Sequence, residues 1–420
     1  MTSGNIDFTL IKAGRLIDGL GGPPKENMAI LVEGETIKLI GTQQEITPPA
    51  GAFIRELDYS GYTVLPGLVD AHTHLNGIGD GRATDDLATL TDDILLLQSV
   101  KNAQTTLRSG VTSIRENGSM GHTTLSLKEA IQMGIATGPN MMLCGRPLTI
   151  TGGHMWYFGS EADGIDGVKR EVRQLIKEGV DYIKIVATGG STRTSFPSLP
   201  SYNVDELQSI ADETHKFGKL TATHCGSTQG IINSLDAGID MIIHCIFTEP
   251  DGTYKFNEKV AERIGKAGAY VNPTLHVNRS QLFRLQNKEL SEGLSKEEHL
   301  HLERVKRGHE TRLDHTRRMI SMGLKVIGGS DSAWGVYPMG GFVHELDCLI
   351  EAGFSPSQAV VAGTRESAKS IGLGDLAGTI ESGKPADILV VDGDPNEDIN
   401  ALWNVVKVLL GGKLVPTFVE

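Results

Sequence analysis

The sequence has few cysteines, few aromatic residues and no long apolar segment. The four cysteines form no CxxC pair, and three lie in apolar runs, where cysteine usually acts as a small buried side chain. They are Cys144, Cys225, Cys245 and Cys348. No stretch approaches the roughly 18 apolar residues of a membrane span, and the first residues lack the basic and apolar regions of a secretory signal. We therefore expect no disulfide and no membrane partner, and we predict a cytoplasmic protein.

An excess of basic residues is also missing. The chain has 52 Asp and Glu against 39 Lys and Arg, which gives a formal net charge of -13 at pH 7. A nucleic-acid partner would require a basic face that neutralises phosphates, so we expect none. Glycine is abundant, with 51 residues, but no strand is followed by GxGxxG and a helix, which argues against dinucleotide binding.

The chain is long, and short apolar runs recur along it. Its 420 residues exceed the usual domain of about 100 to 200 residues, but suit a barrel of about 250 residues with a smaller appended part. Residues 1–60 and 375–420 read as short strands separated by turns, which predicts one small β-sandwich built from both chain termini. In residues 61–374, short apolar runs alternate with helical stretches, the pattern of a parallel sheet wrapped by helices.

Eight of these apolar runs are candidate barrel strands. They cover residues 64–75, 110–117, 140–148, 182–190, 220–225, 241–245, 270–275 and 325–331. Amphipathic segments such as 204–218 and 355–372 have the apolar spacing of helices. The predicted fold class is therefore α/β, a (β/α)8 TIM barrel with the terminal β-sandwich. The charged connection at about 281–322 predicts a helical insertion, which is either a lid near the barrel mouth or a solvated pair of surface helices.

Histidines lie at the ends of three candidate strands. His72 and His74 are two residues apart, so on a strand they project to the same face. His224 and His244 end two further apolar runs. Each alone could be a hydrogen-bonded core residue, but the carboxyl ends of barrel strands meet at one mouth, where active sites form. Four histidines gathered there predict a metal site.

Two charged residues lie in apolar surroundings of the same kind. Asp331 ends the eighth run, where a carboxylate is unfavourable unless it is paired; a divalent cation is one partner, and capping of the next helix is the alternative. Lys184 lies inside an apolar strand, and a protonated lysine has no lone pair for a metal. Either a carboxylate across the barrel neutralises Lys184, or carbon dioxide converts its amine into a carbamate, whose two oxygens can bridge two cations.

Together these residues resemble a known family. The run VLPGLVDAHTHL, the strand lysine, the strand-terminal histidines, the GGSD aspartate and the closing KPADILVVDGDP are similar to the amidohydrolase superfamily, in its prolidase-like and imidazolonepropionase-like branch. The resemblance spans nearly the whole chain. It implies two divalent metal ions per chain, with zinc as the metal, and a homo-oligomer. One ion would be held by His72, His74 and Asp331 and the other by His224 and His244, with N6-carboxylated Lys184 as the bridge.

The resemblance also implies a mechanism and a set of substrate contacts. Two ions lower the pKa of a shared water toward about 7, so that metal-activated hydroxide attacks an amide carbonyl, while Asp331 acts as general base and then as acid. His154 matches a family histidine that contacts the substrate carbonyl, although it could be structural. Trp156, with Tyr157 and Phe158, could form an apolar wall or simply pack. His276 could bind a substrate carboxylate, with Arg193 or Arg279 as rivals.

One departure from the family concerns substrate size. Relatives that cleave small dipeptides often carry tyrosine or histidine two positions after the first of the two later histidines, where this chain has Gly226. We therefore expect an N-acyl amino acid or dipeptide-like substrate with a bulky aromatic acyl group, as in ochratoxin-degrading members. A cyclic amide, a phenylurea or a carbamate is the alternative. A non-catalytic structural relative would lack metal ligands, whereas all six are present.

Overall fold

The computed structural model describes residues 8–416, so the ends of the predicted terminal sandwich, 1–7 and 417–420, lie outside the described residues. Each of the eight runs expected to be a barrel strand contains a strand. These strands are β5 (Leu68–Thr73), β6 (Val111–Glu116), β7 (Asn140–Leu143), β8 (Ile183–Val186), β9 (Thr221–Ser227), β10 (Met241–Thr248), β11 (Tyr270–Asn272) and β12 (Lys325–Val326).

The eight strands form two parallel sheets. In the described chain, β5, β6 and β7 make one sheet and β8 to β12 the other. Isolated parallel bridges connect Leu148 with Ile185 at one edge and Thr73 with Ser332 at the other. Strands β5, β6 and β8 are buried along their whole length. Continuous apolar runs are expected in such strands because both faces of a parallel sheet are covered.

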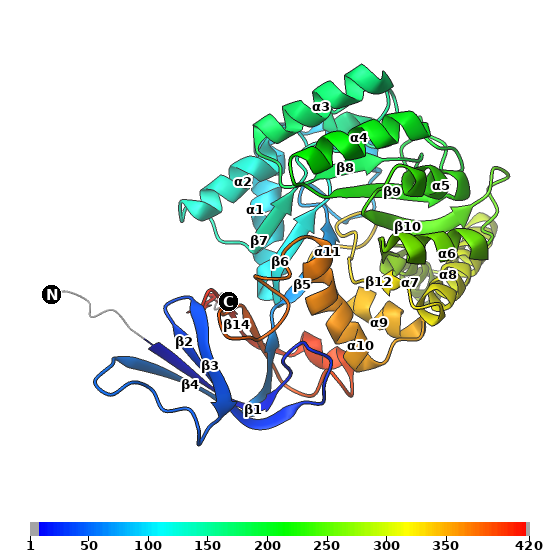
Figure 1. Ribbon diagram of the computed structural model, residues 1–420. Helices are drawn as coiled ribbons and strands as arrows, with labels where there is room; N and C mark the ends of the chain where they lie inside the picture. Colours follow the sequence, from blue (N-terminus) through cyan, green and yellow to red (C-terminus); the bar gives the residue numbers. More distant parts are fainter. Residues whose placement is uncertain (1–7, 417–420) are drawn as a thin grey trace.

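Helices on the outside of these strands connect each strand to the next (Figure 1). They are α1 (Asp92–Arg108), α2 (Thr123–Gln132), α3 (Gly164–Glu178), α4 (Val204–Lys216), α5 (Thr228–Asp236) and α6 (Glu258–Ala267). The start of α4 shows how the sequence sets such a boundary. Asn203 accepts a hydrogen bond from the backbone N–H of Glu206, whose carboxylate accepts one from the backbone of Asn203, so this capping box satisfies two free donors.

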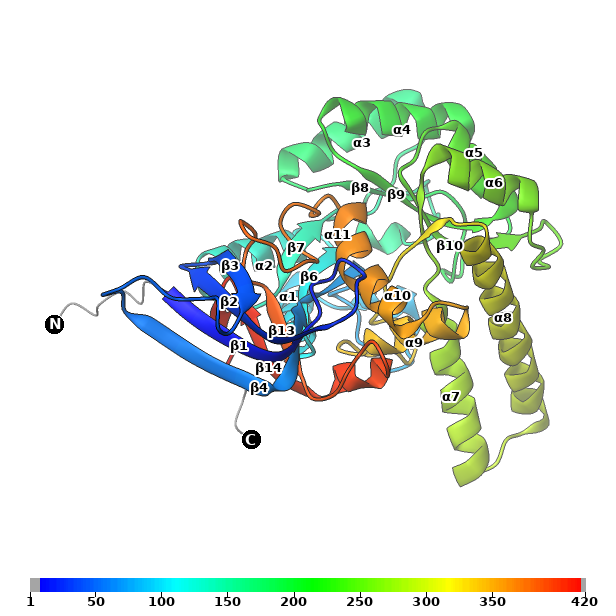
Figure 2. The same cartoon turned by 60° about the horizontal axis from the view of Figure 1, so that its bottom comes forward.

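The predicted helical insertion is a hairpin of two helices. Helices α7 (Leu275–Ser291) and α8 (Lys296–Ser321) run antiparallel and project away from the strands (Figure 2). The first helix starts six residues before the predicted boundary, directly after β11. Outside the main core, the two helices share a small apolar cluster of Leu282, Leu285, Leu302 and Val305.

The chain then returns to the strands through shorter helices. Helix α9 spans Val343–Glu351, and the expected helix at 355–372 is divided into α10 (Pro356–Val361), a π-helical turn (Ala362–Glu366) and α11 (Ser367–Ser370). Among residues 8–416, none of the helices combines the length and the apolar character needed to cross a bilayer.

Strands from both ends of the chain form one mixed sheet. Over residues 8–416 it has seven strands in the order β15-β14-β13-β4-β1-β2-β3, in which β1 and β4 run parallel. The strands are β1 (Phe8–Leu16), β2 (Lys25–Glu33), β3 (Thr36–Thr42), β4 (Ile54–Pro66), β13 (Ile388–Val391), β14 (Val405–Leu410) and β15 (Lys413–Leu414). The predicted sandwich of two facing sheets is not confirmed.

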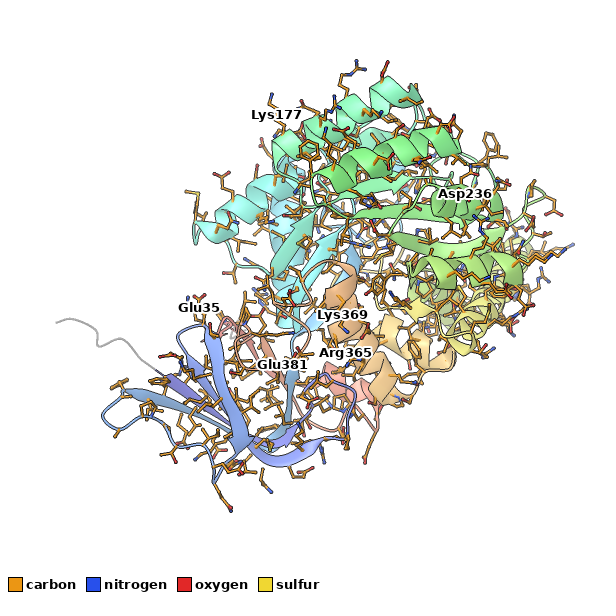
Figure 3. All side chains as sticks on the ribbon, viewed as in Figure 1. Glu35, Lys177, Asp236, Arg365, Lys369 and Glu381 are labelled. Carbon is orange, nitrogen blue, oxygen red and sulfur yellow. The ribbon has the colours of Figure 1, made fainter. Side chains whose placement is uncertain are left out.

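Specific hydrogen bonds tie this terminal sheet to the rest of the molecule. Asp387, which directly precedes β13, accepts a hydrogen bond from Asn140 at the start of β7 (2.8 Å). Arg365, which Figure 3 labels beside the terminal sheet, donates to the carbonyl of Leu20 (2.7 Å). The sheet is therefore held against the barrel strands by side chains that are far apart in the sequence.

Candidate metal centre

Three potential metal ligands converge where β5 and β12 end. His72 and His74 direct their Nε2 atoms at each other, 3.2 Å apart. Asp331 follows β12, and its Oδ1 lies 3.3 Å from each Nε2 atom. All three side chains are buried, and their ligand atoms lie within 4.8 Å of one another. The alternation of side chains along β5 brings the two histidines to one face.

Hydrogen bonds fix the proton positions on both rings. The Nδ1 of His72 lies 3.0 Å from Oδ1 of Asn272, whose amide nitrogen donates to the carbonyl of Gly329. The Nδ1 of His74 lies 3.3 Å from the carbonyl of Gly118. Both Nδ1 atoms must therefore donate, which leaves a lone pair on each Nε2. Two lone pairs and a carboxylate facing one point fit a divalent cation with nitrogen and oxygen ligands.

A second histidine pair lies next to this group. The Nε2–H of His224 donates to the carbonyl of Gly189 (3.1 Å), so its Nδ1 carries the lone pair. That Nδ1 lies 2.9 Å from Nε2 of His244, whose Nδ1 is 2.6 Å from the hydroxyl of Thr274. When His244 donates to Thr274, two lone pairs again face one point. The ring centres of His72 and His244 are 5.8 Å apart, so the two pairs share one site.

Lys184 lies on β8 in the same cavity. Its side chain is 1% exposed, and its Nζ donates to Oδ1 of Asn117 (3.3 Å). It forms no ion pair with any residue from 8 to 416 within 4.0 Å, so the expected alternative of a neutralising carboxylate is not realised there. Burial lowers the pKa of Lys184 from 10.5 to about 7. A lysine with that pKa is substantially neutral and nucleophilic at neutral pH, as reaction with carbon dioxide requires.

The backbone around these ligands adopts strained conformations. Among the described residues, positive φ angles outside glycine occur almost entirely at this end of the barrel strands. The residues are Met155, His244, Cys245, Phe247, Thr274 and Asp331, with Asn27 as the exception. Such angles are unfavourable for residues with a Cβ and persist where surrounding structure enforces them, often at functional sites.

The convergent side chains line a cavity of about 520 Å³. The cavity wall includes all six predicted metal ligands: His72, His74, Lys184, His224, His244 and Asp331. Apolar and aromatic side chains form much of the remaining wall, including Met155, Tyr157, Ile246, Tyr254 and Trp334. The site therefore joins a polar, metal-suited floor to a largely apolar chamber, the usual composition of a small-molecule site.

His154 also lines this cavity. Its Nδ1 lies 2.7 Å from the hydroxyl of Thr192 and 3.4 Å from the backbone N–H of the same residue. The Thr192 hydroxyl in turn accepts from the backbone of Met155, so its own proton is available to His154. Nδ1 is thus an acceptor, and the ring proton is on Nε2. Burial, followed by the nearby basic groups of His224 and Lys184, lowers the pKa of His154 well below its ordinary value, which keeps the ring neutral.

This geometry can be set beside known proteins. The family model described as "Amidohydrolase family" matches residues 63–415, which include every strand of the two parallel sheets and every convergent ligand. The chain belongs to the amidohydrolase family. As an amidohydrolase it is a hydrolase that acts on C–N bonds, and members of this family generally bind divalent metal ions.

Individual amidohydrolases resemble the chain over almost its full length. An ochratoxinase of Aspergillus niger is 28% identical over 97% of this chain and 86% of its own length. An imidazolonepropionase of Symbiobacterium thermophilum is 23% identical over 98% of this chain and 97% of its own. The crystal structure of a Xaa-Pro dipeptidase with methionine bound in the active site superposes with a TM-score of 0.84 at 27% identity, covering 98% of this chain and all of that one.

Three residues expected to bind substrate in this amidohydrolase are not in the cavity wall. Trp156 is 37% exposed, and its neighbour Tyr157 faces the cavity instead. Arg193 is 71% exposed and lies 3.7 Å from Asp86. His276 lines a second cavity of about 560 Å³, where its ring stacks on His344.

The rival arginine also lies elsewhere. Arg279 donates to Asp347 (2.7 Å) and Glu351 (2.6 Å) and to Nδ1 of His276 (3.1 Å). Its charge is therefore already paired with two carboxylates of α9. Two residues that were not predicted from the sequence also line the metal-suited cavity: Trp334, three residues after Asp331, and Arg312 on α8. Trp334 could have been found from its closeness to Asp331, whereas the charged run around Arg312 gives no such signal.

Proposed function

We propose that this amidohydrolase is a binuclear metal enzyme that cleaves the amide C–N bond of an N-acyl amino acid or dipeptide-like substrate with a bulky aromatic acyl group. The observation that carries the proposal is the gathering of six donor side chains in one cavity. His72, His74 and Asp331 would hold one ion and His224 and His244 the other, with Lys184, carboxylated on Nζ, between them.

The wider architecture belongs to the same proposal. We infer a closed (β/α)8 barrel over residues 61–374, because single bridges join both edges of the two parallel sheets. We propose that residues 1–60 and 375–420 make a separate small domain that contains the terminal sheet, and that the α7–α8 hairpin is an insertion in the barrel. Assembly into a homo-oligomer remains a prediction from the sequence.

The donor chemistry favours zinc, because imidazole nitrogens and carboxylate oxygens are among its usual ligands. When bound, two such ions would polarise the scissile carbonyl and lower the pKa of water. Lys184 would contribute through its carbamate, which forms when the neutral amine attacks the carbon of carbon dioxide and loses a proton. The carbamate replaces a buried amine with an anion that suits two cations.

The protein side chains divide the remaining work. Asp331 would accept a proton from the attacking water and deliver it to the leaving nitrogen. His154 carries its ring proton on Nε2. It would donate that hydrogen bond to the carbonyl oxygen as negative charge develops there. Both side chains line the same cavity, so one substrate can reach both.

Two observations support a bulky acyl group. Gly226 lines the cavity, and a Cβ atom there would make ordinary van der Waals contacts with Ile246, Pro197 and Thr188 at 3.8 to 3.9 Å, so the absence of a side chain leaves the adjoining part of the cavity to the substrate. The apolar wall of Met155, Tyr157 and Trp334 suits an aromatic ring. The similarity to the Aspergillus niger ochratoxinase agrees with such a substrate.

Exchange of Asp331 for asparagine tests the proposed chemistry. Asp331→Asn keeps an oxygen near the first ion but removes the proton acceptor, so turnover should fall by roughly 100- to 10,000-fold while much of the metal stays bound. Turnover of N-benzoyl-L-phenylalanine and metal content are measured on the same preparation. A variant with the wild-type rate would refute the assignment. A cyclic amide or phenylurea substrate would be recognised by its product, a ring-opened acid or an aryl amine rather than a free amino acid.

A further inference from the structure

Arg312 is a cation in the cavity wall without a carboxylate partner. It lies on α8, in the insertion, and its side chain lines the same cavity as the six predicted ligands. Of the lysine and arginine side chains in that wall, only Lys184 accompanies it. Arg312 forms no ion pair within residues 8–416, in contrast to Arg279 on α7, which contacts two carboxylates.

One end of the Arg312 guanidinium is fixed by backbone oxygens. Its Nη2 donates to the carbonyl of Pro273 (3.2 Å) and lies 3.4 and 3.5 Å from the carbonyl and hydroxyl oxygens of Thr274. Its Nε is buried and has no hydrogen-bond partner, and no described residue accepts from Nη1. A partly buried charged donor without an acceptor is unfavourable. The group is thus held in place while part of its hydrogen-bonding capacity stays unused.

Arg312 is also close to the metal-suited floor. The Thr274 hydroxyl that lies near its Nη2 is 2.6 Å from Nδ1 of His244. A single threonine therefore separates the guanidinium from a candidate metal ligand. Arg312 and the six predicted ligands line the same cavity, so a ligand whose amide carbonyl lies beside the predicted ligands can extend toward Arg312.

We propose that Arg312 binds the α-carboxylate of the amino-acid half of the substrate. The inference rests on the proposed function and deepens it, since it restricts substrates to N-acyl amino acids with a free carboxylate and assigns a role to the α7–α8 insertion. A planar guanidinium can donate two hydrogen bonds to one carboxylate, which makes arginine well suited to this recognition. Amides and esters of the same amino acids lack the negative charge and bind weakly.

The test uses a pair of ligands in which a methylene group replaces the nitrogen of the scissile amide, so neither can be cleaved at that position. The ketomethylene isostere of N-benzoyl-phenylalanine, 2-benzyl-4-oxo-4-phenylbutanoate, and its primary amide differ only in the carboxylate. Calorimetric titration of the metal-loaded enzyme should show that the acid binds about 10- to 100-fold more tightly than the amide, as expected for hydrogen bonds between charged groups. In Arg312→Met, the acid should lose that advantage while the amide binds as it does to the wild type.

Two further variants sharpen the comparison. Arg307→Met, an exposed change on the same helix, should leave both affinities unchanged. Arg312→Lys keeps the charge but loses the planar guanidinium, so it should lower only the affinity for the acid, by about tenfold. This variant also tests the proposal if Arg312→Met does not fold. Equal weakening of acid and amide would overturn the proposal, because Arg312 would then merely hold Thr274 and His244 in place. Equal binding of both ligands to the wild type would overturn it as well.

Hydrolysis of N-benzoyl-L-phenylalanine is measured separately, so that the two proposals can fail independently. Selective binding of the acid without any turnover would reject the proposed reaction and leave the carboxylate site standing. Turnover that is equally fast for the acid and its amide, together with equal binding, would reject the role of Arg312 and leave the metal chemistry standing.

Discussion

Gly190 lies against the ring of His154, so closely that a Cβ atom at this position would come within 2.5 Å of Nε2. The ring has little room to move, because its Nδ1 is hydrogen-bonded to the hydroxyl of Thr192 and its centre lies 4.5 Å from that of the His224 ring. The absence of a side chain at Gly190 therefore leaves room for the His154 ring in a position from which its Nε2–H can donate to a substrate carbonyl.

Gly190→Ala should displace the His154 ring and lower kcat while metal content stays unchanged. Complete loss of such a donor lowers kcat by roughly 100- to 1,000-fold. The loss of kcat in His154→Ala is therefore the largest expected, and the kcat of Gly190→Ala should lie between that of His154→Ala and that of the wild type. Gly167→Ala on α3, where a Cβ meets nothing within 4 Å, is the matched control. Wild-type kcat in both Gly190→Ala and His154→Ala would show that His154 does not act on the substrate.

Reloading of metal-depleted enzyme should depend on carbon dioxide and on pH through Lys184. Its amine has a pKa of about 7, so it is protonated and unreactive below pH 7 and becomes nucleophilic as the pH rises through that value. Burial lowers the pKa of His72 and His244 well below 6.5 and that of His224 to about 4, so these ligands stay neutral at pH 6.

We therefore expect activity to return faster at pH 8 than at pH 6 when zinc and bicarbonate are added, and slowly in carbon dioxide-free buffer. The measurement is the rate of recovery of turnover. Recovery that is indifferent to both bicarbonate and pH would argue against a carbamate on Lys184. Lys184→Ala should be inactive, and a small carboxylate such as acetate should restore part of its activity by standing in for the carbamate.

Gly226→Tyr should change which acyl group the enzyme accepts. A Cβ atom at Gly226 makes only ordinary contacts, and because this residue lines the cavity, the rest of a tyrosine side chain would take up cavity volume. We expect kcat/KM for N-benzoyl-L-phenylalanine to fall about tenfold or more, the loss of one to two kcal/mol of apolar contact, while that for Ala-Pro holds or rises. Gly226→Ala should change little. An equal fall for both substrates would mean that the position does not border the acyl group.

Ser330→Ala should weaken both the fold and the metal centre. The Ser330 hydroxyl donates to Oδ2 of buried Asp70 (2.6 Å), and the Ser330 backbone donates to Oδ1 (2.8 Å). Loss of the hydroxyl leaves a buried carboxylate with fewer donors and should lower the free energy of unfolding by about 1 to 3 kcal/mol. Thermal unfolding with and without zinc measures the effect. An unchanged Tm would show that the hydrogen bond from the Ser330 hydroxyl to Asp70 does not contribute to stability.

The barrel strands and the convergence of the six side chains on one cavity could be predicted from the sequence for a simple reason. Parallel strands covered on both faces read as continuous apolar runs, and polar residues at their carboxyl ends have only one place to meet. The alternation of side chains along β5 was enough to put His72 and His74 on one face. Lys184 was recognisable because a charge within an apolar strand needs a chemical reason.

Residues beyond the strand ends could not be placed in this way. Thr274 has φ 49°, and α7 begins at the next residue, so helical rather than strand periodicity decides what faces the cavity; Val277 lines it and His276 turns away. The place of Arg312 in the cavity wall could not be predicted, because it reaches the site from a charged helix whose position depends on the packing of the whole hairpin. The single terminal sheet likewise depends on pairings between the two chain ends.

The most direct test of the binuclear centre is the metal content of the active protein, measured by mass spectrometry on wild type and on His244→Ala. Two equivalents of divalent metal per chain are expected in the wild type. The variant should retain less metal and lose turnover, and chelation should abolish wild-type activity until zinc is restored. Full turnover by metal-free protein, or a metal content that His244→Ala leaves unchanged, would contradict the proposed pair of ions.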